Sequence, residues 1–396
     1  MAISFEQARS IIVREAATLG TPAVEVVPLL EAAGRVLAET IAADRDYPPT
    51  PRSMRDGFAV RAGDVPGVLR VIGEVRAGEQ WNGPSLEAGQ AIEIMTGAPV
   101  PDGADAVIMV EHVTRDGERI RTEVQAKNGE NINPTGKEAA QGTALAHPGR
   151  RLNFADVALL AAVGRTDVRV YRRPTVAILA TGDEVVPVDV ARPEAYQVRN
   201  SNSYSVAVQV ARAGGLPQIL PVAPDRYDET RALMEQGLQY DMLLLSGGVS
   251  AGKYDIVEKV LADLGAEFFF DRVKIQPGAP LVFGKVAGKY FFGLPGNPAS
   301  TMVTFAVLAR VLLDGLAGIA DSQLPIAWAK LTRPFRHKAG LRRFLPARLA
   351  EGGMLTPVAW AGSSDVSALA RANAFLIADP DKPEYAEGDW IQVLPE

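Results

Sequence analysis

Residues 241–248 read Asp-Met-Leu-Leu-Leu-Ser-Gly-Gly, and this stretch decides the fold class. An apolar run that leads directly into a serine and two glycines is typical of a buried strand ending in a tight turn. Residues 175–182, Thr-Val-Ala-Ile-Leu-Ala-Thr-Gly, have the same pattern. The pattern also predicts a strand at 218–222 and helices at 203–213, 228–237 and 255–264. This alternation indicates a parallel α/β sheet, with strand ends along one edge where ligands bind.

On both sides of this α/β block, the hydrophobic pattern of the sequence changes. An amphipathic helix is predicted at 4–19, where Ser4 and Gln7 have capping-box spacing, and a short helix is predicted at 29–38. Short β-like runs with Gly-Pro turns follow, then a helix at 153–163 and a β-rich end with one helix at 366–372. The fold class is therefore multidomain α/β plus β. The predicted divisions are a helical linker domain (1–46 and 144–170), an inserted β domain (47–143), an α/β domain (171–323) and a C-terminal β domain (324–396).

Composition excludes several function classes. The 396 residues include 41 Lys plus Arg and 47 Asp plus Glu, a net charge of −6, so no basic face for nucleic acid is expected. With no cysteine, thiolate metal sites and cysteine nucleophiles are excluded, and any metal is expected to have oxygen ligands, as Mg²⁺ does. No signal peptide is visible, and the apolar run 302–313 is too short to span a bilayer. A cytoplasmic protein without a membrane partner is expected.

The end of the first quoted strand, at residues 246–248, predicts an anion site. Ser246, Gly247, Gly248 and Ser250 offer backbone N–H groups and hydroxyls, and Asp255 stands at the start of the next predicted helix. There Asp255 can hold a metal over a bound phosphate. An ordinary glycine-rich turn capped by Asp255 would give the same pattern.

Other strand ends carry candidate side chains as well. Thr181-Gly-Asp-Glu184 places two carboxylates at the sheet edge, although a turn with a capping aspartate explains it equally. In Leu294-Pro-Gly-Asn297-Pro298, the asparagine can cap a helix whose first residue is the proline. Asp56 precedes a glycine and can be a simple turn residue.

In this order, the motifs resemble the molybdopterin molybdenumtransferase family, the bacterial relatives of the gephyrin E domain. The matching stretches are Ser53-x-x-Asp56-Gly-Phe-Ala59, Thr96-Gly-Ala-Pro99 with Asp105-Ala-Val, Thr181-Gly-Asp-Glu184, Asn200-Ser-Asn-Ser203, Ser246-Gly-Gly-Val-Ser250-x-Gly-x-x-Asp255 and Leu294-Pro-Gly-Asn-Pro298-x-Ser300. Each is weak alone, but the ordered set is specific and spans most of the chain.

The resemblance implies a reaction between adenylylated molybdopterin and molybdate that releases AMP and depends on Mg²⁺. It implies that the catalytic carboxylates are Glu184, Asp225 and Asp255, with Glu184 and Asp255 on the metal. Asp56 would serve the partner subunit's site in a homodimer. The substrate-binding residues it implies are Thr181, Gly182, Asp183, Ser246, Gly247, Gly248, Ser250, Lys274, Pro280, Pro295, Asn297, Pro298 and Ser300.

Departures from the family pattern fall where molybdate would bind. Ala279 stands where the family has lysine, and Leu341 interrupts the usual Gly-Arg pair. We expect Arg342 with Ser363 to hold the oxyanion and Lys274 to replace the missing charge, unless these cations are only solvated surface groups.

Two other functions stay open at this point. The α/β block alone also resembles the molybdopterin adenylyltransferase domain, although the inserted and C-terminal domains argue against it. A non-enzymatic scaffold of the gephyrin kind ranks last, because no stretch indicates a receptor-binding partner.

Overall fold

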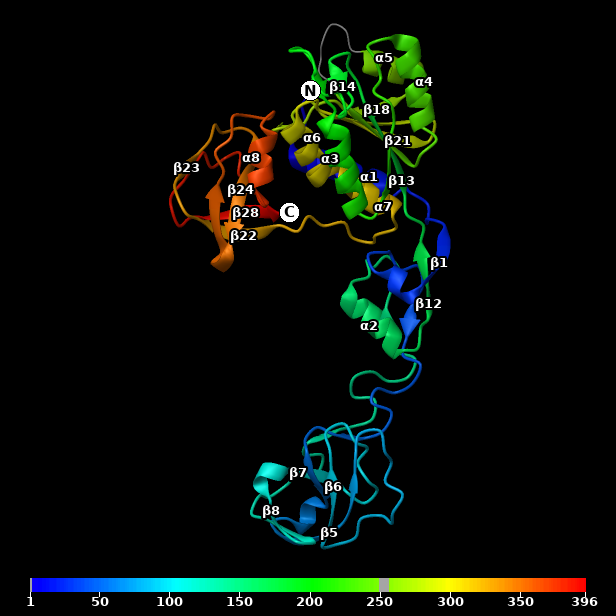
Figure 1. Ribbon diagram of the computed structural model, residues 1–396, viewed down its shortest axis with the longest axis vertical. Coiled ribbons are helices and arrows are strands. Elements are labelled where there is room, and N and C mark those ends of the chain that lie inside the picture. Colours follow the sequence, from blue (N-terminus) through cyan, green and yellow to red (C-terminus); the bar gives the residue numbers. More distant parts are fainter. Residues whose placement is uncertain (1, 249–255) are drawn as a thin grey trace. The chain divides into compact units, whose positions relative to one another are not determined.

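The computed structural model describes residues 2–248 and 256–396. These form two compact units: Met1–Ala38, Pro148–Asn153 and Asp167–Glu396 make the first, and Glu39–His147 with Phe154–Thr166 make the second (Figure 1). The predicted sites Ser250 and Asp255 lie outside the described residues.

The first unit is built on a six-stranded sheet that confirms the α/β expectation. The strand order is β16 (Leu216–Ile219), β13 (Thr175–Ala180), β17 (Met242–Ser246), β21 (Lys289–Leu294), β20 (Val282–Val286) and β18 (Glu267–Phe270). The first four are parallel, as predicted, but β20 is antiparallel to both of its neighbours. The expectation of a purely parallel sheet was wrong there because Ala287 and Gly288, both at positive φ, close a tight hairpin between β20 and β21.

Helices cover both faces of this sheet (Figure 1). One apolar cluster joins one face to α1, α3 and the α6–α7 run, and another joins the opposite face to α4 and α5. The bounds are α1 (Phe5–Ala16), α3 (Ser201–Arg212), α4 (Tyr227–Gly237), α5 (Ile256–Asp263), α6 (Pro298–Thr304), the π-helical η4 (Phe305–Ala309) and α7 (Arg310–Leu316). By length and composition Pro298–Leu316 could cross a membrane, but 72% of its apolar window is buried, as in a core helix.

The N-terminal segment confirms one local prediction and corrects another. Ser4 and Gln7 form the predicted capping box at the start of α1. The helix predicted at 29–38 is wrong: only a 3₁₀ turn, η1 (Leu29–Ala32), forms there, after β1 (Val24–Pro28). Gly34, at φ 77°, ends the turn, and β1 pairs with β12 (Asp167–Tyr171).

A second six-stranded sheet contains most of the C-terminal segment. Its order is β19 (Ile275–Gln276), β24 (Arg342–Ala350), β25 (Met354–Pro357), β22 (Ala327–Leu331), β28 (Trp390–Pro395) and β26 (Ala374–Ala378). Because β19 pairs with β24, the segment that connects β18 and β20 of the α/β sheet is tied to the C-terminal sheet. Smaller elements are α8 (Val366–Arg371), η5 (Glu351–Gly353), the β23–β27 pair (Phe335–Arg336, Glu384–Tyr385) and the β14–β15 pair (Val185–Val186, Val198–Arg199).

The second unit is mainly a β domain. Its six-stranded sheet has the order β7 (Ala106–Met109), β4 (Gly57–Val60), β6 (Gln90–Ile94), β5 (Gly67–Val75), β9 (Arg119–Thr122) and β8 (Thr114–Asp116). The remaining elements are β2 (Ile41–Ala42) with β11 (Ala144–Ala146), β3 (Arg52–Ser53) with β10 (Ile132–Asn133), η2 (Ala62–Asp64), η3 (Val110–His112) and α2 (Phe154–Ala162).

Candidate functional site

A cavity of about 940 Å³ lies at the carboxyl ends of β13, β17 and β21. The parallel register aligns Ala180 with Ser246 and Ser246 with Leu294, so three loops begin at the same level. Polar groups that follow three neighbouring strands therefore face one space, the usual place for a ligand in an open α/β sheet.

Backbone contacts hold the loops after β13 and β17 close together. The N–H of Thr181 donates to the carbonyl of Ser246 at 3.0 Å, and the N–H of Gly247 donates to Leu294 at 3.3 Å. Gly247 has a φ of 94°, and a Cβ there would lie 2.8 Å from the Thr181 carbonyl oxygen. Glycine is needed at this turn, both for its conformation and for the close approach of the loops. Gly248, at φ 63°, is equally crowded by Thr181 Oγ1 but does not line the cavity.

Two buried side-chain oxygens in this wall have no hydrogen-bond partner among residues 2–248 and 256–396. They are Thr181 Oγ1 and Asn202 Oδ1, and both residues line the cavity. Unpaired buried polar atoms cost stability, so their presence in the same wall is typical of a ligand site.

The start of α3 contributes to the same wall. Asn200 caps the helix by accepting a hydrogen bond from the N–H of Ser203 at 3.1 Å, and it is buried. Asn202 donates from Nδ2 to Ser246 Oγ at 2.9 Å and to the Gly296 carbonyl at 2.7 Å. One amide thus joins the loops that follow β17 and β21.

The predicted acids occupy different positions. Glu184 lines the cavity, with its carboxylate against Gly182. Asp183 accepts a hydrogen bond from the N–H of Asp225 at 3.1 Å, and neither of these exposed residues lines the cavity. Within residues 2–248 and 256–396, no group of three His, Asp or Glu side chains could hold a metal ion. A metal here would need oxygens from its ligand as well.

A second wall comes from residues 275–280 and the C-terminal sheet domain. Leu341, Trp360 and Ser363 line it, together with Ala279. Ser363 Oγ accepts a hydrogen bond from Asn297 Nδ2 at 2.9 Å, and its carbonyl accepts one from the N–H of Ala299. Asn297 caps no N–H with its side chain, contrary to the capping role expected from sequence, because its amide reaches Ser363 instead.

The cations expected at this wall are not brought to the cavity. Arg342 Nη2 forms an ion pair with Glu6 at 3.0 Å, and its guanidinium lies over the Phe5 ring. The exposed Lys274 and the half-buried Arg342 are both absent from the lining. Among the described lining residues the one cation is Arg199, and its guanidinium donates to the carbonyls of Val190 and Ala191.

The remaining predicted residues divide between the two units. Pro280, Pro295, Pro298 and Ser300 all line the cavity. Asp56 belongs to the second unit, where its Oδ1 accepts hydrogen bonds from the N–H and the hydroxyl of Thr96 at 2.6 and 2.8 Å. These bonds hold the pKa of the Asp56 carboxyl below its usual value.

Sequence reasoning left some lining residues out of the predicted site. Asn200 and Asn202 were noted as a motif but given no role, and Gln276 and Trp360 were not singled out. The asparagines carried a usable signal, because two amides at the start of a helix that follows a strand lie at the ligand edge. Trp360 carried no such signal.

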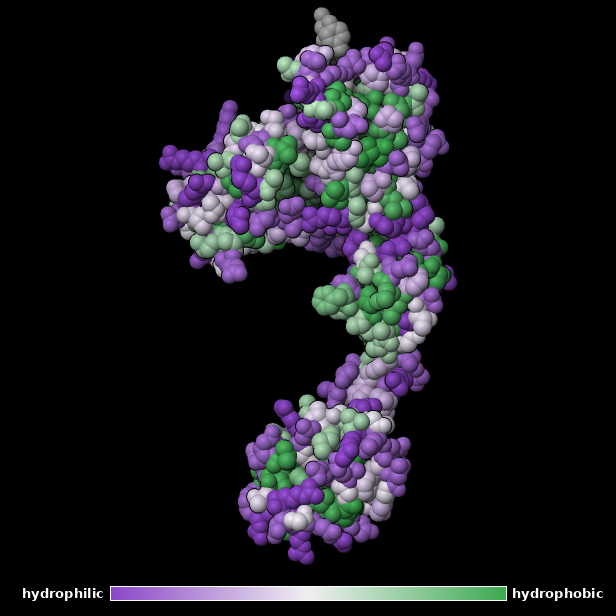
Figure 2. Space-filling model, viewed as in Figure 1, coloured by the Kyte–Doolittle hydropathy of each residue, from purple (hydrophilic) through white to green (hydrophobic). Residues whose placement is uncertain are grey.

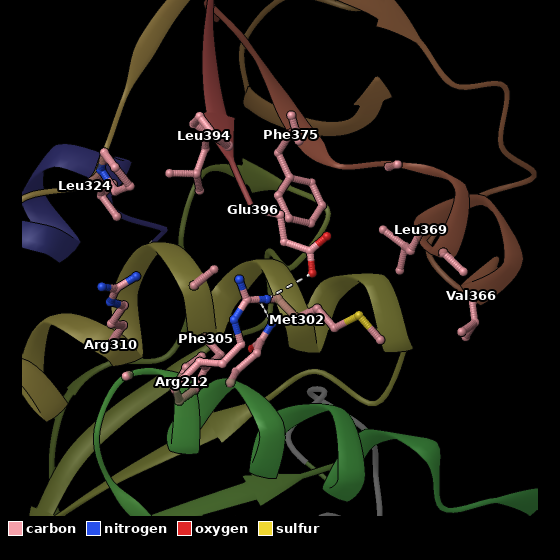
Figure 3. A pocket seen from close by; sticks show the side chains of 18 residues that line it. Arg212, Met302, Phe305, Arg310, Leu324, Val366, Leu369, Phe375, Leu394 and Glu396 are labelled. Carbon is pink, nitrogen blue, oxygen red and sulfur yellow. Dashed lines mark hydrogen bonds and ion pairs between the residues drawn. The ribbon is translucent and has the colours of Figure 1, made fainter. Parts of the chain in front are cut away.

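A second cavity, of about 600 Å³, differs in chemistry (Figure 3). Met302, Phe305, Leu369, Phe375 and Leu394 give it apolar walls, and Arg212 pairs with Glu396 at 3.3 Å across it. Val366 lines both cavities. Among its described lining residues this cavity has one side-chain amide, that of Gln209, and no serine or threonine hydroxyl.

Comparisons with known proteins agree with this geometry. Residues 3–164 match a family described as the MoeA N-terminal region (domain I and II), 177–314 match a probable molybdopterin binding domain, and 328–395 match the MoeA C-terminal region (domain IV). The molybdopterin molybdenumtransferase of Bacillus subtilis (strain 168) is 36% identical over 389 residues, which cover 93% of this chain and 89% of that protein. The chain belongs to the MoeA family of molybdopterin molybdenumtransferases.

Further relatives agree over the whole chain. A molybdopterin molybdenumtransferase from Synechococcus elongatus is 33% identical and covers 99% of both chains. The crystal structure of a molybdopterin biosynthesis MoeA protein from Pyrococcus horikoshii OT3 has a TM-score of 0.81 at 28% identity, with all of both chains covered. MoeA membership confirms the resemblance and the fold class, and it makes the chain a transferase of molybdenum cofactor biosynthesis. A separate adenylyltransferase or a scaffold is not favoured, since the matches include the N- and C-terminal regions.

Proposed function

We propose that this chain inserts molybdenum into molybdopterin, taking adenylylated molybdopterin and molybdate and releasing AMP. The observation that carries the proposal is the cavity where three strand-end loops present hydroxyl and amide groups beside one carboxylate. A pyrophosphate group needs such donors, and a second anion can lie against the wall that contains Ala279 and Ser363.

In this proposal each wall has its own task. Thr181, Ser246 and the Gly247 turn bind the phosphate end, and Ser363 faces the oxyanion. No nucleophilic side chain is required, because a water oxygen can attack the molybdopterin phosphorus while the bond to AMP breaks, and the protein then supplies positioning and stabilisation of charge on the departing AMP.

Mg²⁺ fits this donor set. Mg²⁺ prefers oxygen ligands and commonly uses one or two carboxylates together with substrate phosphates and water. Glu184 is the carboxylate that the described lining provides, and Thr181 and Ser246 are oxygen donors beside it. When bound, Mg²⁺ would neutralise charge that develops on the phosphate oxygens. Glu184 would hold the ion, and the sequence-predicted Asp255 would complete the protein's share.

A homodimer completes the proposal. Asp56 would reach the partner subunit's site, where its lowered pKa keeps it ionised at neutral pH. The helix α2 of the second unit has exposed apolar side chains, with Phe154 89% exposed, which a second copy can cover (Figure 2). We place this assembly in the cytoplasm.

The test uses purified protein with adenylylated molybdopterin, molybdate and Mg²⁺, and measures AMP release and the molybdenum bound to the product. Glu184→Gln should remove the Mg²⁺ dependence of AMP release, whereas Glu194→Gln, an exposed control, should not. No AMP release by wild type, or net adenylylation of molybdopterin from ATP, would contradict the proposal.

The composite site has its own test: subunit exchange between Asp56→Ala and Glu184→Ala dimers should restore up to about a quarter of the sites.

A further inference from the structure

The side-chain amide of Asn202 is fixed by two acceptors. Its Nδ2 donates to the Gly296 carbonyl at 2.7 Å and to Ser246 Oγ at 2.9 Å. A carbonyl oxygen can only accept, so the amide atom that faces Gly296 must be the nitrogen. The same NH₂ group therefore donates its other hydrogen to Ser246.

This arrangement decides what the Ser246 hydroxyl can do. A hydroxyl that accepts from Asn202 keeps its own proton for another acceptor. Within the described part of the chain, no acceptor for that proton is found, and Ser246 lines the cavity. The proton is thus available to a ligand oxygen.

The unpaired oxygen of the same amide supports a functional reason for this geometry. Asn202 Oδ1 is buried and has no hydrogen-bond partner among the residues that the structure describes. Leaving a buried acceptor unpaired is unfavourable, so the two hydrogen bonds that the amide donates must offset this cost. An asparagine whose role is to donate two hydrogen bonds, to Gly296 and to Ser246, explains both these bonds and the unpaired oxygen.

A second amide–serine pair lies in the wall that contains Ala279 and Ser363. Asn297 Nδ2 donates to Ser363 Oγ at 2.9 Å, so this hydroxyl also keeps its proton for the cavity. Since the guanidinium of Arg199 already donates to backbone carbonyls, neutral donors must do much of the anion binding among the described lining residues. The direction of each hydroxyl then matters more than it would beside a free cation.

We propose that Asn202 is a positioning residue, which holds the Ser246 hydroxyl as a hydrogen-bond donor toward a phosphate oxygen of the ligand. The identity of that ligand rests on the proposed function. Asn202 itself does not touch the reacting atoms and acts through Ser246.

A double-mutant cycle on the full chain tests this inference, with AMP as the probe and calorimetry as the measurement. Asn202→Ala and Ser246→Ala should each weaken AMP binding about tenfold, since each removes one hydrogen bond to a charged group. The double variant should also be about tenfold weaker, because both changes remove the same interaction. A hundredfold loss in the double variant, or unchanged binding in Asn202→Ala, would overturn the inference.

Two further variants separate positioning from loosening of α3. Ser205→Ala removes a hydroxyl that donates to the Asn202 carbonyl but leaves the amide alone, so AMP binding should stay at the wild-type level. Asn202→Leu keeps the volume without a donor, so it should repeat the tenfold loss if the alanine variant proves unstable.

A pH profile distinguishes the positioning role from a purely structural one, because a structural role predicts no dependence on Ser246. In Asn202→Asp the carboxylate accepts the Ser246 proton, so AMP binding relative to wild type should recover as pH falls toward about 4, where the carboxyl protonates. With Ser246→Ala added, only charge repulsion remains and the recovery should be smaller. Equal recovery in both backgrounds would contradict a role through Ser246.

The outcome also separates this inference from the proposed function. A wild-type chain that binds AMP but inserts no molybdenum would overturn the proposed function, and the cycle would still decide the role of Asn202. A wild-type chain that does not bind AMP would overturn both.

Discussion

The two walls of the main cavity differ in how they are prepared for an anion. The wall from β13, β17, β21 and α3 is a connected set of donors, in which backbone bonds and the Asn202 amide fix each loop against the next. The second wall has Ala279, Leu341 and Trp360, with Ser363 held by Asn297. Preorganised donors bind without further ordering, so the first wall should dominate affinity and the second should be open to improvement.

The largest effect is expected where the first wall is tightest. Gly247→Val should reduce AMP binding by about a hundredfold or more, because φ 94° is strained for valine and its Cβ would meet the Thr181 carbonyl at 2.8 Å. Calorimetry measures the loss. Gly265→Ala is the control, since this glycine also has a positive φ but open space around it. Unchanged AMP binding in Gly247→Val would show that the first wall does not dominate affinity.

A smaller effect, of opposite sign, is expected on the second wall. Ala279→Lys should lower the molybdate concentration for half-maximal insertion about tenfold, because it adds a charged donor to a wall where the structure brings neither Lys274 nor Arg342. Ala279→Met adds length without charge and should give no gain. If the lysine variant behaves like the methionine variant, this wall does not contact the oxyanion.

Substitution of Arg342 or Lys274, the cations that the sequence predicted at that wall, should change activity even less. Arg342→Ala should lower the free energy of unfolding by about 1 kcal/mol, through loss of the Glu6 pair and the Phe5 contact. The molybdate dependence should stay within about twofold of wild type, as it should in Lys274→Ala. Denaturant unfolding and insertion curves measure both. A large rise in the molybdate concentration for half-maximal insertion would show that these cations do contribute to the site.

The smallest effect concerns the loop that carries Ser363. Asp365 caps α8 and accepts hydrogen bonds from the N–H groups of Ala361 and Ala368 and from the Ser367 hydroxyl, which hold its pKa below the usual value. A lowered folded-state pKa gives stability that is present above the unfolded pKa of about 3.9 and is lost as pH falls through the folded pKa.

Asp365→Asn should therefore melt slightly below wild type at neutral pH, and the difference should shrink below about pH 4. Thermal unfolding between pH 7 and pH 3.5 measures it. A difference that stays constant with pH would show that charge on Asp365 does not matter.

Local pattern determined a large part of this protein. The apolar run before Ser246 and the run before Thr181 form neighbouring parallel strands, and the glycine turn and the α1 capping box form where the sequence placed them. These features depend on residues close in sequence, whose periodicity and turn chemistry act locally. The helix expected at 29–38 failed because Gly34 and the β-bridges of Val36 with Arg151 and of Leu37 with Val170 prevailed over a weak local preference.

Only the tertiary structure decided which side chains meet. Residues 275–276 join the C-terminal sheet, the Asn202 amide bridges two distant loops, and Arg342 turns to Glu6 rather than to the cavity. No local pattern encodes such contacts, since they arise when elements far apart in the chain pack and each buried polar group takes the partner that packing brings within reach. The sequence thus determined at which positions hydrogen-bond donors occur, and packing decided which of these donors face the ligand.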